Sequence, residues 1–318
     1  MRHPGRPFWR ETDRDRGWGC AELLANLQDS LRILDQWFPS KRTGTFSIEP
    51  SALLDQKPRI EQRWGVFFTG GIDASSVVRL NRLRYPISHS RSFKDGILVF
   101  GLEQDDPKKF GLVRKSLEPL EDAAGLTMIR VDTNVYLPYR EEDKATRFQF
   151  WAQKFNGAAL AAVGHALAGR LSGVTIAASQ DLETPDRWGT HPILDACFGS
   201  SNLRVSHEGQ SFARFERTRL VAGWKPALRT LRVCNNYKQY KEAYLNCGAC
   251  EQCVRTMLML LAIKTLHRTD AFRAKDLTAS AVRKYANICL DPDELIPMYK
   301  EKCFPDSSSW AGRIWSGQ

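Results

Sequence analysis

Short, mainly hydrophobic runs alternate with longer amphipathic segments between residues 64 and 178. The runs have the length of buried strands and cover residues 64–68, 95–100, 126–131 and 174–178. Segments with apolar residues at helical spacing lie between them, over residues 74–83, 107–124 and 146–171. Buried parallel strands are apolar throughout and are connected by helices, so this alternation predicts an α/β fold with a parallel sheet and helices on both faces.

The segments on either side of this pattern have a different character. Residues 21–38 have apolar positions at helical spacing. Residues 43–49 could form a strand, and residues 50–63 have the composition of a linker. Residues 212–224 form a predicted amphipathic helix with solvated or paired Arg and Glu side chains, and further helix is predicted from residue 255. We therefore expect three parts: an N-terminal extension (1–63), an α/β domain (64–210) and a C-terminal helical region (211–318).

Composition and charge narrow the class of protein. Hydrophobic residues make up 42% of the 318 residues, charged residues make up 26%, and the formal net charge is +10. The lysines and arginines are spread out with no aromatic-interleaved basic run, which favours a basic surface around a site for small anions over a nucleic-acid surface. There is no apolar run long enough to span a membrane, and the polar, arginine-rich start is neither a secretory signal nor an anchor. We expect a cytoplasmic protein without membrane contact.

Four of the eight cysteines lie close together in the sequence. They are Cys234, Cys247, Cys250 and Cys253, and the last three form two overlapping Cys-x-x-Cys steps. Four thiolates at such spacings can surround a tetrahedral Zn²⁺, and closed four-cysteine sites have a structural role. The alternative is a set of unligated or disulfide-bonded cysteines. The other cysteines are scattered without framework spacing, as expected of an intracellular protein.

The segment from residue 69 to residue 76 lies where the first predicted strand passes into a helix. Its sequence is Thr69-Gly70-Gly71-Ile72-Asp73-Ala74-Ser75-Ser76. Ligands of open α/β sheets bind at the carboxyl ends of strands, glycines let an anion approach the backbone, and a helix N-terminus offers free N–H groups. Asp73 would repel phosphate unless a magnesium ion or a structural hydrogen bond accounts for it. The alternative is a tight connection in which Asp73 caps the helix.

A long polar connection follows the fourth predicted strand. Residues 179–209 leave that strand at the same edge of the sheet as the glycine turn, and long loops inside compact domains tend to be functional. Trp188 offers an aromatic face and His191 a titratable imidazole. Asp181 and Glu208 offer carboxylates for the amidine edge of a purine-like substrate. The alternative for each is an ordinary hydrogen-bonded loop position.

The glycine turn and the cysteines together resemble one family. Residues 68–75 are similar to the Ser-Gly-Gly-x-Asp-Ser pyrophosphate loop of the N-type ATP pyrophosphatase superfamily. The cysteine cluster and Arg255 match, in order and spacing, the zinc module of its 7-cyano-7-deazaguanine synthases. The resemblance covers roughly residues 64–267. Synthase-like proteins, some of them from bacterial anti-phage systems, also resemble residues 188–195 and 246–257.

This resemblance implies an adenine nucleotide alpha hydrolase-like fold of the HUP type that binds ATP, Mg²⁺ and Zn²⁺. The implied nucleotide contacts are Thr69, Gly70, Gly71, Ile72, Asp73, Ser75, Ser76, Phe100 and Arg255. Asp73 and Ser75 would act in catalysis, and the polar connection would bind a small deazapurine-like substrate. Thr69 replaces the first serine of the family loop and keeps a hydroxyl. Ala74 replaces the last serine of the family loop and has no hydroxyl. Ser75 can supply that hydroxyl only if the helix starts one residue later.

Three functions follow as hypotheses. The first is an ATP-dependent C–N ligase that adenylates a carboxylate or amide of a 7-deazaguanine-type substrate, releases pyrophosphate and transfers the acyl group to ammonia or another amine, a protein being one candidate acceptor. The second is a tRNA-modifying enzyme of the same superfamily. The third, suggested by Ala74, is a degenerate nucleotide-binding scaffold. The resemblance also suggests a homodimer and a role in queuosine synthesis or antiviral defence.

Overall fold

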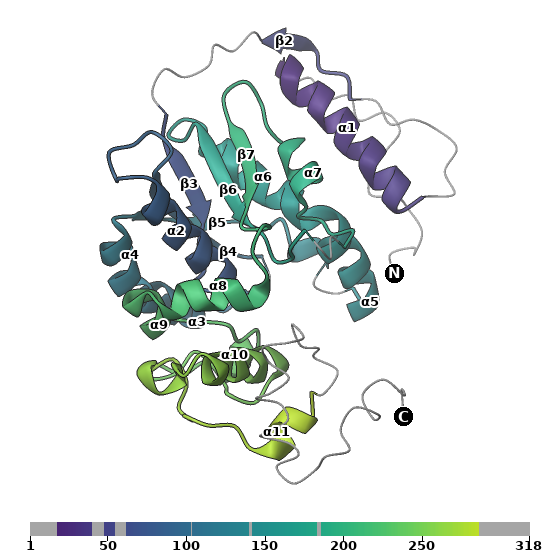
Figure 1. The fold of residues 1–318 in the computed structure, drawn as a ribbon. Helices are drawn as coiled ribbons and strands as arrows, with labels where there is room; N and C mark the ends of the chain where they lie inside the picture. The colour runs from purple at the N-terminus through teal and green to yellow at the C-terminus, as the bar shows by residue number, and fades with distance from the viewer. Residues whose placement is uncertain are drawn as a thin grey trace.

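A five-stranded, fully parallel sheet forms the centre of the protein (Figure 1). The computed structural model describes residues 18–39, 48–54, 62–102, 104–139, 142–182 and 186–285. The strand order is β5-β4-β3-β6-β7. In chain order the strands are β3 (Trp64–Phe67), β4 (Phe93–Phe100), β5 (Thr127–Asp132), β6 (Gly173–Ala177) and β7 (Arg204–Glu208). The predicted parallel α/β fold is therefore confirmed.

Helices cover both faces of this sheet. Their bounds are α1 (Ala21–Trp37), α2 (Ile72–Arg84), α3 (Pro107–Ser116), α4 (Glu118–Ala124), α5 (Lys144–Arg147), α6 (Asn156–Ala166), α7 (Pro192–Ala196), α8 (Arg214–Ala222), α9 (Lys225–Arg229), α10 (Glu251–Ala262) and α11 (Ala279–Arg283). One hydrophobic cluster joins the sheet to α2, α3, α4, α8, α9 and α10, and another joins it to α6, α7 and α1. Figure 1 shows these two groups on opposite sides of the strands.

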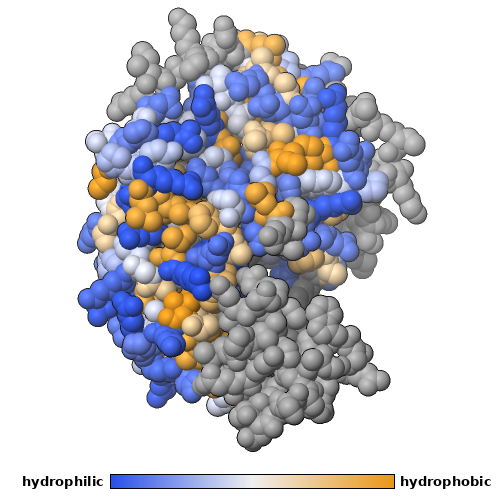
Figure 2. Space-filling model, viewed as in Figure 1, coloured by the Kyte–Doolittle hydropathy of each residue, from blue (hydrophilic) through white to orange (hydrophobic). Residues whose placement is uncertain are grey.

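The first of these clusters is continuous across the predicted boundary at residue 210. It contains Val77 and Val78 of α2 together with Phe215 of α8 and Met257 of α10. The glycine turn and the cysteine region are thus parts of one core. Figure 2 shows hydrophilic residues over most of one face, with hydrophobic residues gathered where α2 and α4 lie in Figure 1.

Several predicted elements differ from the structure. The predicted helix over 107–124 is two helices that meet at Leu117, because Pro119 lacks the N–H that an uninterrupted helix would need. The helix predicted over 146–171 includes a π-helical stretch, Phe148–Phe155, before α6. The predicted linker 50–63 contains β2 (Ala52–Leu54), which pairs in parallel with β1 (Trp18–Cys20). Of the strand predicted over 43–49, residues 43–47 lie outside the described residues and 48–49 are not in a strand.

The polar connection predicted over 179–209 also contains regular structure. It includes α7 and the whole of β7, which forms one edge of the sheet beside β6. The described part of the chain after α10 is mostly irregular, with α11 as its last helix, so the predicted C-terminal helical region is only partly helical. Among the described helices, none combines the length and apolar character needed to cross a membrane.

A buried carboxylate ties together the amino ends of three strands. The Asp95 side chain is fully buried on β4, and it accepts hydrogen bonds from Arg63 Nε at 2.6 Å and Arg170 Nη2 at 2.7 Å. Arg63 precedes β3 and Arg170 precedes β6, so the carboxylate joins the segments leading into the two central strands. Burial alone would raise the pKa of Asp95, but the two guanidinium groups lower it below its ordinary value.

Replacing Asp95 with Asn is expected to lower the free energy of unfolding by about 3 kcal/mol at neutral pH, because two guanidinium groups lose their counter-charge. Since the pKa of Asp95 is lower in the folded state, its contribution is complete above the unfolded-state pKa and is lost as pH falls below about 4. Urea unfolding at several pH values measures this, with the exposed Asp122→Asn as control. An unchanged difference between wild type and Asp95→Asn from pH 7 to pH 3 would contradict it.

Candidate functional site

The glycine turn lies at the carboxyl end of the central strand β3. After the Phe68 N–H donates to the Ile97 carbonyl, the chain leaves the sheet, and α2 begins at Ile72. Gly71 is the N-cap residue and no side chain caps this end of the helix. The predicted cap by Asp73 is therefore absent, and the first N–H groups of α2 are left for another acceptor. The turn has the backbone groups that an anion needs.

Glycine is required at the first position of this turn. Gly70 has a φ of +75°, a conformation that other residues rarely adopt, and a Cβ there would lie 2.7 Å from Leu117 Cδ2. Gly71 lies against the carbonyl of Arg232, which a Cβ would approach to 3.6 Å. The turn is thus packed between α4 on one side and the chain leading to the cysteines on the other.

The carboxylate of Asp73 is neutralised by two arginines of α8. Asp73 Oδ1 accepts from Arg217 Nη1 at 2.8 Å and lies 3.1 Å from Arg214 Nη1. Arg217 is only 1% exposed and also donates to the carbonyls of Ala178 and Phe212. A structural role therefore accounts for the negative charge beside the turn, and it agrees with the prediction that the arginines of this helix are paired. Among the described residues, none forms a hydrogen bond or an ion pair with Asp73 Oδ2.

The hydroxyl groups of the turn differ in their exposure and in their hydrogen bonds. The Thr69 side chain is exposed beside the turn, whereas Ser76 Oγ donates to the Asp73 carbonyl within the first turn of α2. Ser75 is fully buried and its Oγ has no hydrogen-bond partner. Ser75 lies in the first turn of α2, which starts at Ile72. The structure places Ser75 in the core.

The four cysteines of the motif converge on one point. Cys234 Sγ lies 3.8 Å from Cys250 Sγ, Cys247 Sγ lies 3.9 Å from Cys253 Sγ, and all four sulfur atoms lie within 4.8 Å of one another. These separations exclude disulfides, and a tetrahedral Zn²⁺ with bonds of about 2.3 Å would hold its sulfurs about 3.8 Å apart. The cluster can hold a metal ion, and zinc suits its sulfur ligands.

Backbone amides support the sulfur atoms of this cluster. The N–H groups of Ala249 and Cys250 donate to Cys247 Sγ, at 3.4 and 3.2 Å, around Gly248, whose φ is +70°. A hydrogen bond with Cys253 lowers the pKa of Cys234 to about 5, and the same contact raises the pKa of Cys253. Burial raises the pKa of Cys250 to about 11. A bound cation would favour the thiolate form of all four.

Arg232 connects the cysteine cluster to the glycine turn. Its backbone N–H donates to the Gly70 carbonyl at 2.9 Å, and its Nε donates to the Thr69 carbonyl at 2.9 Å. Its Nη1 donates to the Tyr240 hydroxyl at 2.7 Å, which donates in turn to the Cys234 carbonyl at 2.6 Å. Sequence reasoning missed Arg232 and Tyr240, because neither belongs to a motif. The one feature of the sequence that could have pointed to Arg232 and Tyr240 is their closeness to Cys234, the first cysteine of the cluster.

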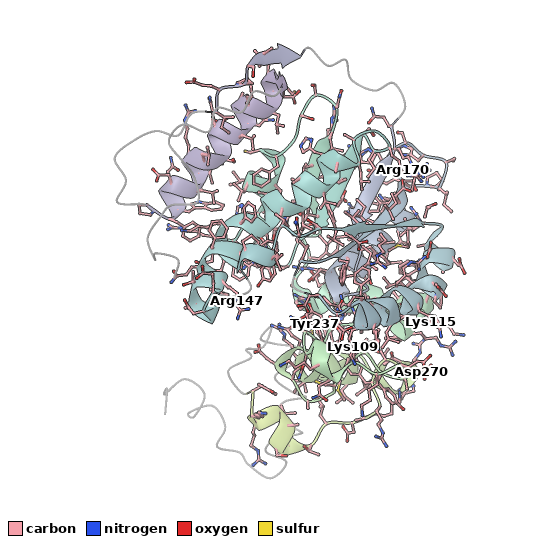
Figure 3. The ribbon with its side chains drawn as sticks, turned by 180° about the vertical axis from the view of Figure 1, so that it is seen from behind. Lys109, Lys115, Arg147, Arg170, Tyr237 and Asp270 are labelled. Carbon is pink, nitrogen blue, oxygen red and sulfur yellow. The ribbon has the colours of Figure 1, made fainter. Side chains whose placement is uncertain are left out.

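Other polar contacts fasten the cluster to its surroundings. The Asn246 side chain accepts from the N–H groups of Val233 and Cys234 and donates to the carbonyls of Leu231 and Ala271. Lys109 of α3 donates to the Tyr240 carbonyl. Figure 3 labels Lys109 and Tyr237 where the cysteine region meets the rest of the protein, with Arg170 at the far end of the sheet. The cluster is rigidly positioned beside the turn.

The two remaining predicted nucleotide contacts lie in different surroundings. Phe100 ends β4, packs edge-to-face on Phe110 at 5.0 Å and lies under the guanidinium of Arg130 at 5.4 Å. Its position at the carboxyl end of the strand beside β3 suits a nucleotide base. Arg255 of α10 is half-buried and donates to Gln252 within its own helix. Arg255 lies two residues after Cys253, the last cysteine of the cluster.

The predicted substrate residues do not form one group. Glu208 ends β7 and lies on the same side of the sheet as α2, near Arg84 and Tyr85. His191 lies at the start of α7, on the other side of the sheet. Trp188 packs edge-to-face on Phe148, and Asp181 is half-buried. The set predicted from residues 179–209 is therefore divided between the two sides of the sheet.

The contacts of His191 are those of an ordinary hydrogen-bonded loop residue, which was the alternative to a role in substrate binding. Its Nδ1 accepts from the Ile193 N–H at the start of α7, and its ring packs on Trp37 of α1 at 4.8 Å. Asp195, fully buried, accepts from the His191 N–H at 3.3 Å. Burial lowers the pKa of His191 and raises that of Asp195. These contacts fix α7 against α1 and β7.

Comparison with known proteins does not add a family or a relative. No protein-family model matches the chain, and no curated protein matches it either. The candidate site is therefore defined by its own geometry: the glycine turn, the arginine-held Asp73 and the cysteine cluster fastened beside them.

The metal prediction is one Zn²⁺ per chain, bound by the four cysteines. Protein purified without chelator is expected to contain about one equivalent of zinc by elemental mass spectrometry. Cys250→Ser should lose most of it, whereas Cys197→Ser, outside the cluster, should retain it. Zinc near zero in the wild-type protein, or equal zinc in both variants, would contradict the assignment.

The two arginines that hold Asp73 should contribute unequally to stability. Arg217→Met removes a buried charge with several partners and is expected to cost about 3–5 kcal/mol of unfolding free energy. Arg214→Met removes a partly exposed partner and is expected to cost below about 1 kcal/mol. Urea unfolding of the two variants makes the comparison. Equal losses would mean that Arg217 does not anchor α8 to the turn.

Proposed function

We propose that this chain is an ATP-dependent C–N ligase similar to the 7-cyano-7-deazaguanine synthases. The observation that carries the proposal is the connection between two features: an uncapped glycine turn at the carboxyl end of the central strand and a four-cysteine cluster fastened to it through Arg232 and Tyr240. The same two features carry the family resemblance in the sequence. In this proposal the fold is of the HUP type.

The residues around the turn fit the triphosphate of ATP. Free N–H groups at the start of α2 would donate hydrogen bonds to the phosphate oxygens, and Thr69 adds a hydroxyl. Arg214 is partly exposed beside the turn, so its guanidinium can contact an anion while Arg217 keeps hold of Asp73. Phe100 would lie against the base. Together these groups offset the charge of the triphosphate and position its α-phosphorus.

Magnesium fits the same turn. Both arginines contact Oδ1 of Asp73, which leaves Oδ2 as an oxygen ligand of the kind Mg²⁺ prefers. Bound there with the phosphates, Mg²⁺ would neutralise charge on the leaving pyrophosphate. The role of Asp73 would thus be shared between the arginines, which fix its orientation, and the cation, which it helps to hold.

The proposed reaction has two steps. An oxygen of the substrate carboxylate or amide attacks the α-phosphorus of ATP, the bond to the bridging oxygen breaks, and pyrophosphate leaves. When the substrate is a carboxylate, ammonia or another amine then attacks the activated carbon, the bond to AMP breaks, and the nitrogen loses a proton. When it is an amide, the nitrogen of the adenylated amide loses its remaining proton as the bond to AMP breaks, which gives the nitrile. In this scheme the protein positions the reactants and stabilises charge, and the cysteine cluster holds the turn in place. A substrate of the 7-deazaguanine type is the candidate that the resemblance suggests.

One observation favours a second candidate, a nucleotide-binding scaffold without catalysis. The family loop carries a hydroxyl at the position of Ala74, and the neighbouring Ser75 is buried away from the turn. The scaffold would bind ATP and not release pyrophosphate.

Exchange of labelled pyrophosphate into ATP separates the two candidates. With 7-deazaguanine carboxylic acids present, the ligase predicts exchange that depends on the acid, and Asp73→Asn should lower the rate roughly a hundredfold. Asp122→Asn is the matched control, and circular dichroism with zinc analysis shows whether each variant is folded. ATP binding without exchange, across the deazaguanine acids tested, would reject the ligase and support the scaffold.

A further inference from the structure

The carboxyl end of α1 is fastened to the protein by the segment that leads into α7. Trp37, the last residue of α1, packs its ring edge-to-face on His191 at 4.8 Å, and its carbonyl accepts from Arg187 Nη1 at 3.0 Å. The last turn of α1 has no basic residue of its own, so a cation from elsewhere is favourable at this end. One turn earlier, Leu34 joins the hydrophobic cluster shared by the sheet, α6 and α7. His191 and Arg187 therefore hold α1 at the point where it ends.

The contacts of His191 require an unprotonated ring nitrogen. His191 is 8% exposed at the N-cap position of α7, and its Nδ1 accepts from the Ile193 N–H at 3.2 Å. A protonated imidazole carries a hydrogen on both nitrogens and cannot accept this bond. It would also place a positive charge at the N-terminus of a helix and near His207. Burial and the charge of His207 lower the pKa of His191, which agrees with a place built for the neutral ring.

Two other histidines lie around this interface and keep their contacts when they are protonated. His207 Nδ1 of β7 lies 2.7 Å from the carboxylate of Asp195, so a proton on His207 favours that contact. His165 Nε2 of α6 lies 2.8 Å from the Phe198 carbonyl, which needs an N–H donor in either charge state of the ring. Acid therefore breaks a hydrogen bond at His191 and leaves the contacts of these two in place.

The remaining charged and titratable groups near this interface come from three elements. They are Lys154 of the π-helical stretch, which lies over the Phe38 ring, Asp29 of α1, and Cys197 at the end of α7, whose pKa is raised by burial and by Asp29. None of these groups is a partner in the hydrogen bond from Ile193 to His191. The Nδ1 atom of His191 is therefore the acid-labile point of the interface.

We propose that His191 is an acid-sensitive clasp between α7 and α1, whose neutral ring caps α7 and holds Trp37 and whose protonated ring leaves this place. The start of α7 and the end of α1 then open together. Once open, the imidazole titrates near its ordinary value of about 6.5, above its pKa in the closed form. The open form thus binds more protons, so opening increases as pH falls below about 6.5. The clasp does not depend on the proposed ligase activity.

Hydrogen exchange followed by mass spectrometry at pH 7.5 and pH 5.5 tests the clasp in the full-length chain. After correction for the pH dependence of intrinsic exchange, the protection of residues 30–38 and 191–198 should fall by roughly three- to tenfold at the lower pH. Peptides from the central strands β3 and β4 should keep their protection. Unchanged protection of the two segments, or an equal loss throughout the chain, would overturn the proposal.

Two variants assign the response to one histidine. His191→Asn keeps a side-chain acceptor that suits an N-cap position and cannot be protonated in this range, so protection should be equal at both pH values. His89→Asn is the matched control: it removes an exposed histidine whose Nδ1 accepts from the Arg91 N–H, and it should respond to acid like the wild type. A full response in His191→Asn would overturn the proposal and assign the effect to the pair of His207 and Asp195.

A titration of the wild-type protein gives a check that needs no variant. The ring resonances of His191, followed by NMR between pH 5 and pH 8, should show a pKa below the ordinary value of a histidine. The closed form must exclude the proton for acid to open it. A pKa at or above about 6.5 would contradict the clasp.

Discussion

The hydrogen bonds of Arg232 to the glycine turn are the interaction on which the rest of the site depends. The turn has a left-handed Gly70 and no side-chain cap, so its conformation is set by what packs against it. The backbone of Arg232 bonds to Gly70 and its side chain to Thr69, and the same guanidinium continues through Tyr240 to Cys234. A cluster that can bind a metal thereby supports a turn whose free backbone N–H groups suit an anion.

Two carboxylates, the buried Asp95 and the partly buried Asp73, organise opposite ends of the sheet in the same way. Asp95 joins arginines that precede β3 and β6, and Asp73 joins α2 to α8 through Arg217. In each case the arginines and the carboxylate are far apart in the sequence. The carboxylate can hold these segments together because the arginines compensate its negative charge. At the turn this compensation has a further consequence, because it removes the repulsion that an unpaired Asp73 would impose on a phosphate.

β3, β4 and β6 could be predicted from the sequence because they are largely buried on both faces, so their residues are mainly apolar. β7 was missed because it is an edge strand with polar residues on one face, such as Ser206 and Glu208, and Val205 as its one buried apolar side chain. The break before α4 was readable in Pro119, which an uninterrupted helix does not tolerate.

The parts of the candidate site that lie within one short sequence motif could be predicted from the sequence. Four cysteines within twenty residues determine their own geometry, and the structure confirms a possible metal cluster. The arginine partners of Asp73 could not be predicted, because Arg217 is 144 residues away and meets it only through the packing of α8 on α2. The places of the predicted substrate residues could not be read from the sequence either: His191 and Glu208 are close along the chain, but the structure puts His191 at the start of α7 and Glu208 on β7 beside α2.

Hydrogen exchange with and without metal is the most direct test of whether the cysteine cluster supports the turn. Removing the metal with a chelator should speed amide exchange at Arg232 and across residues 69–76, while peptides from β4 and β5 stay protected. The Arg232 amide is the most informative probe, because it donates to Gly70. Faster exchange confined to residues 247–253, with Arg232 and the turn unchanged, would contradict the account.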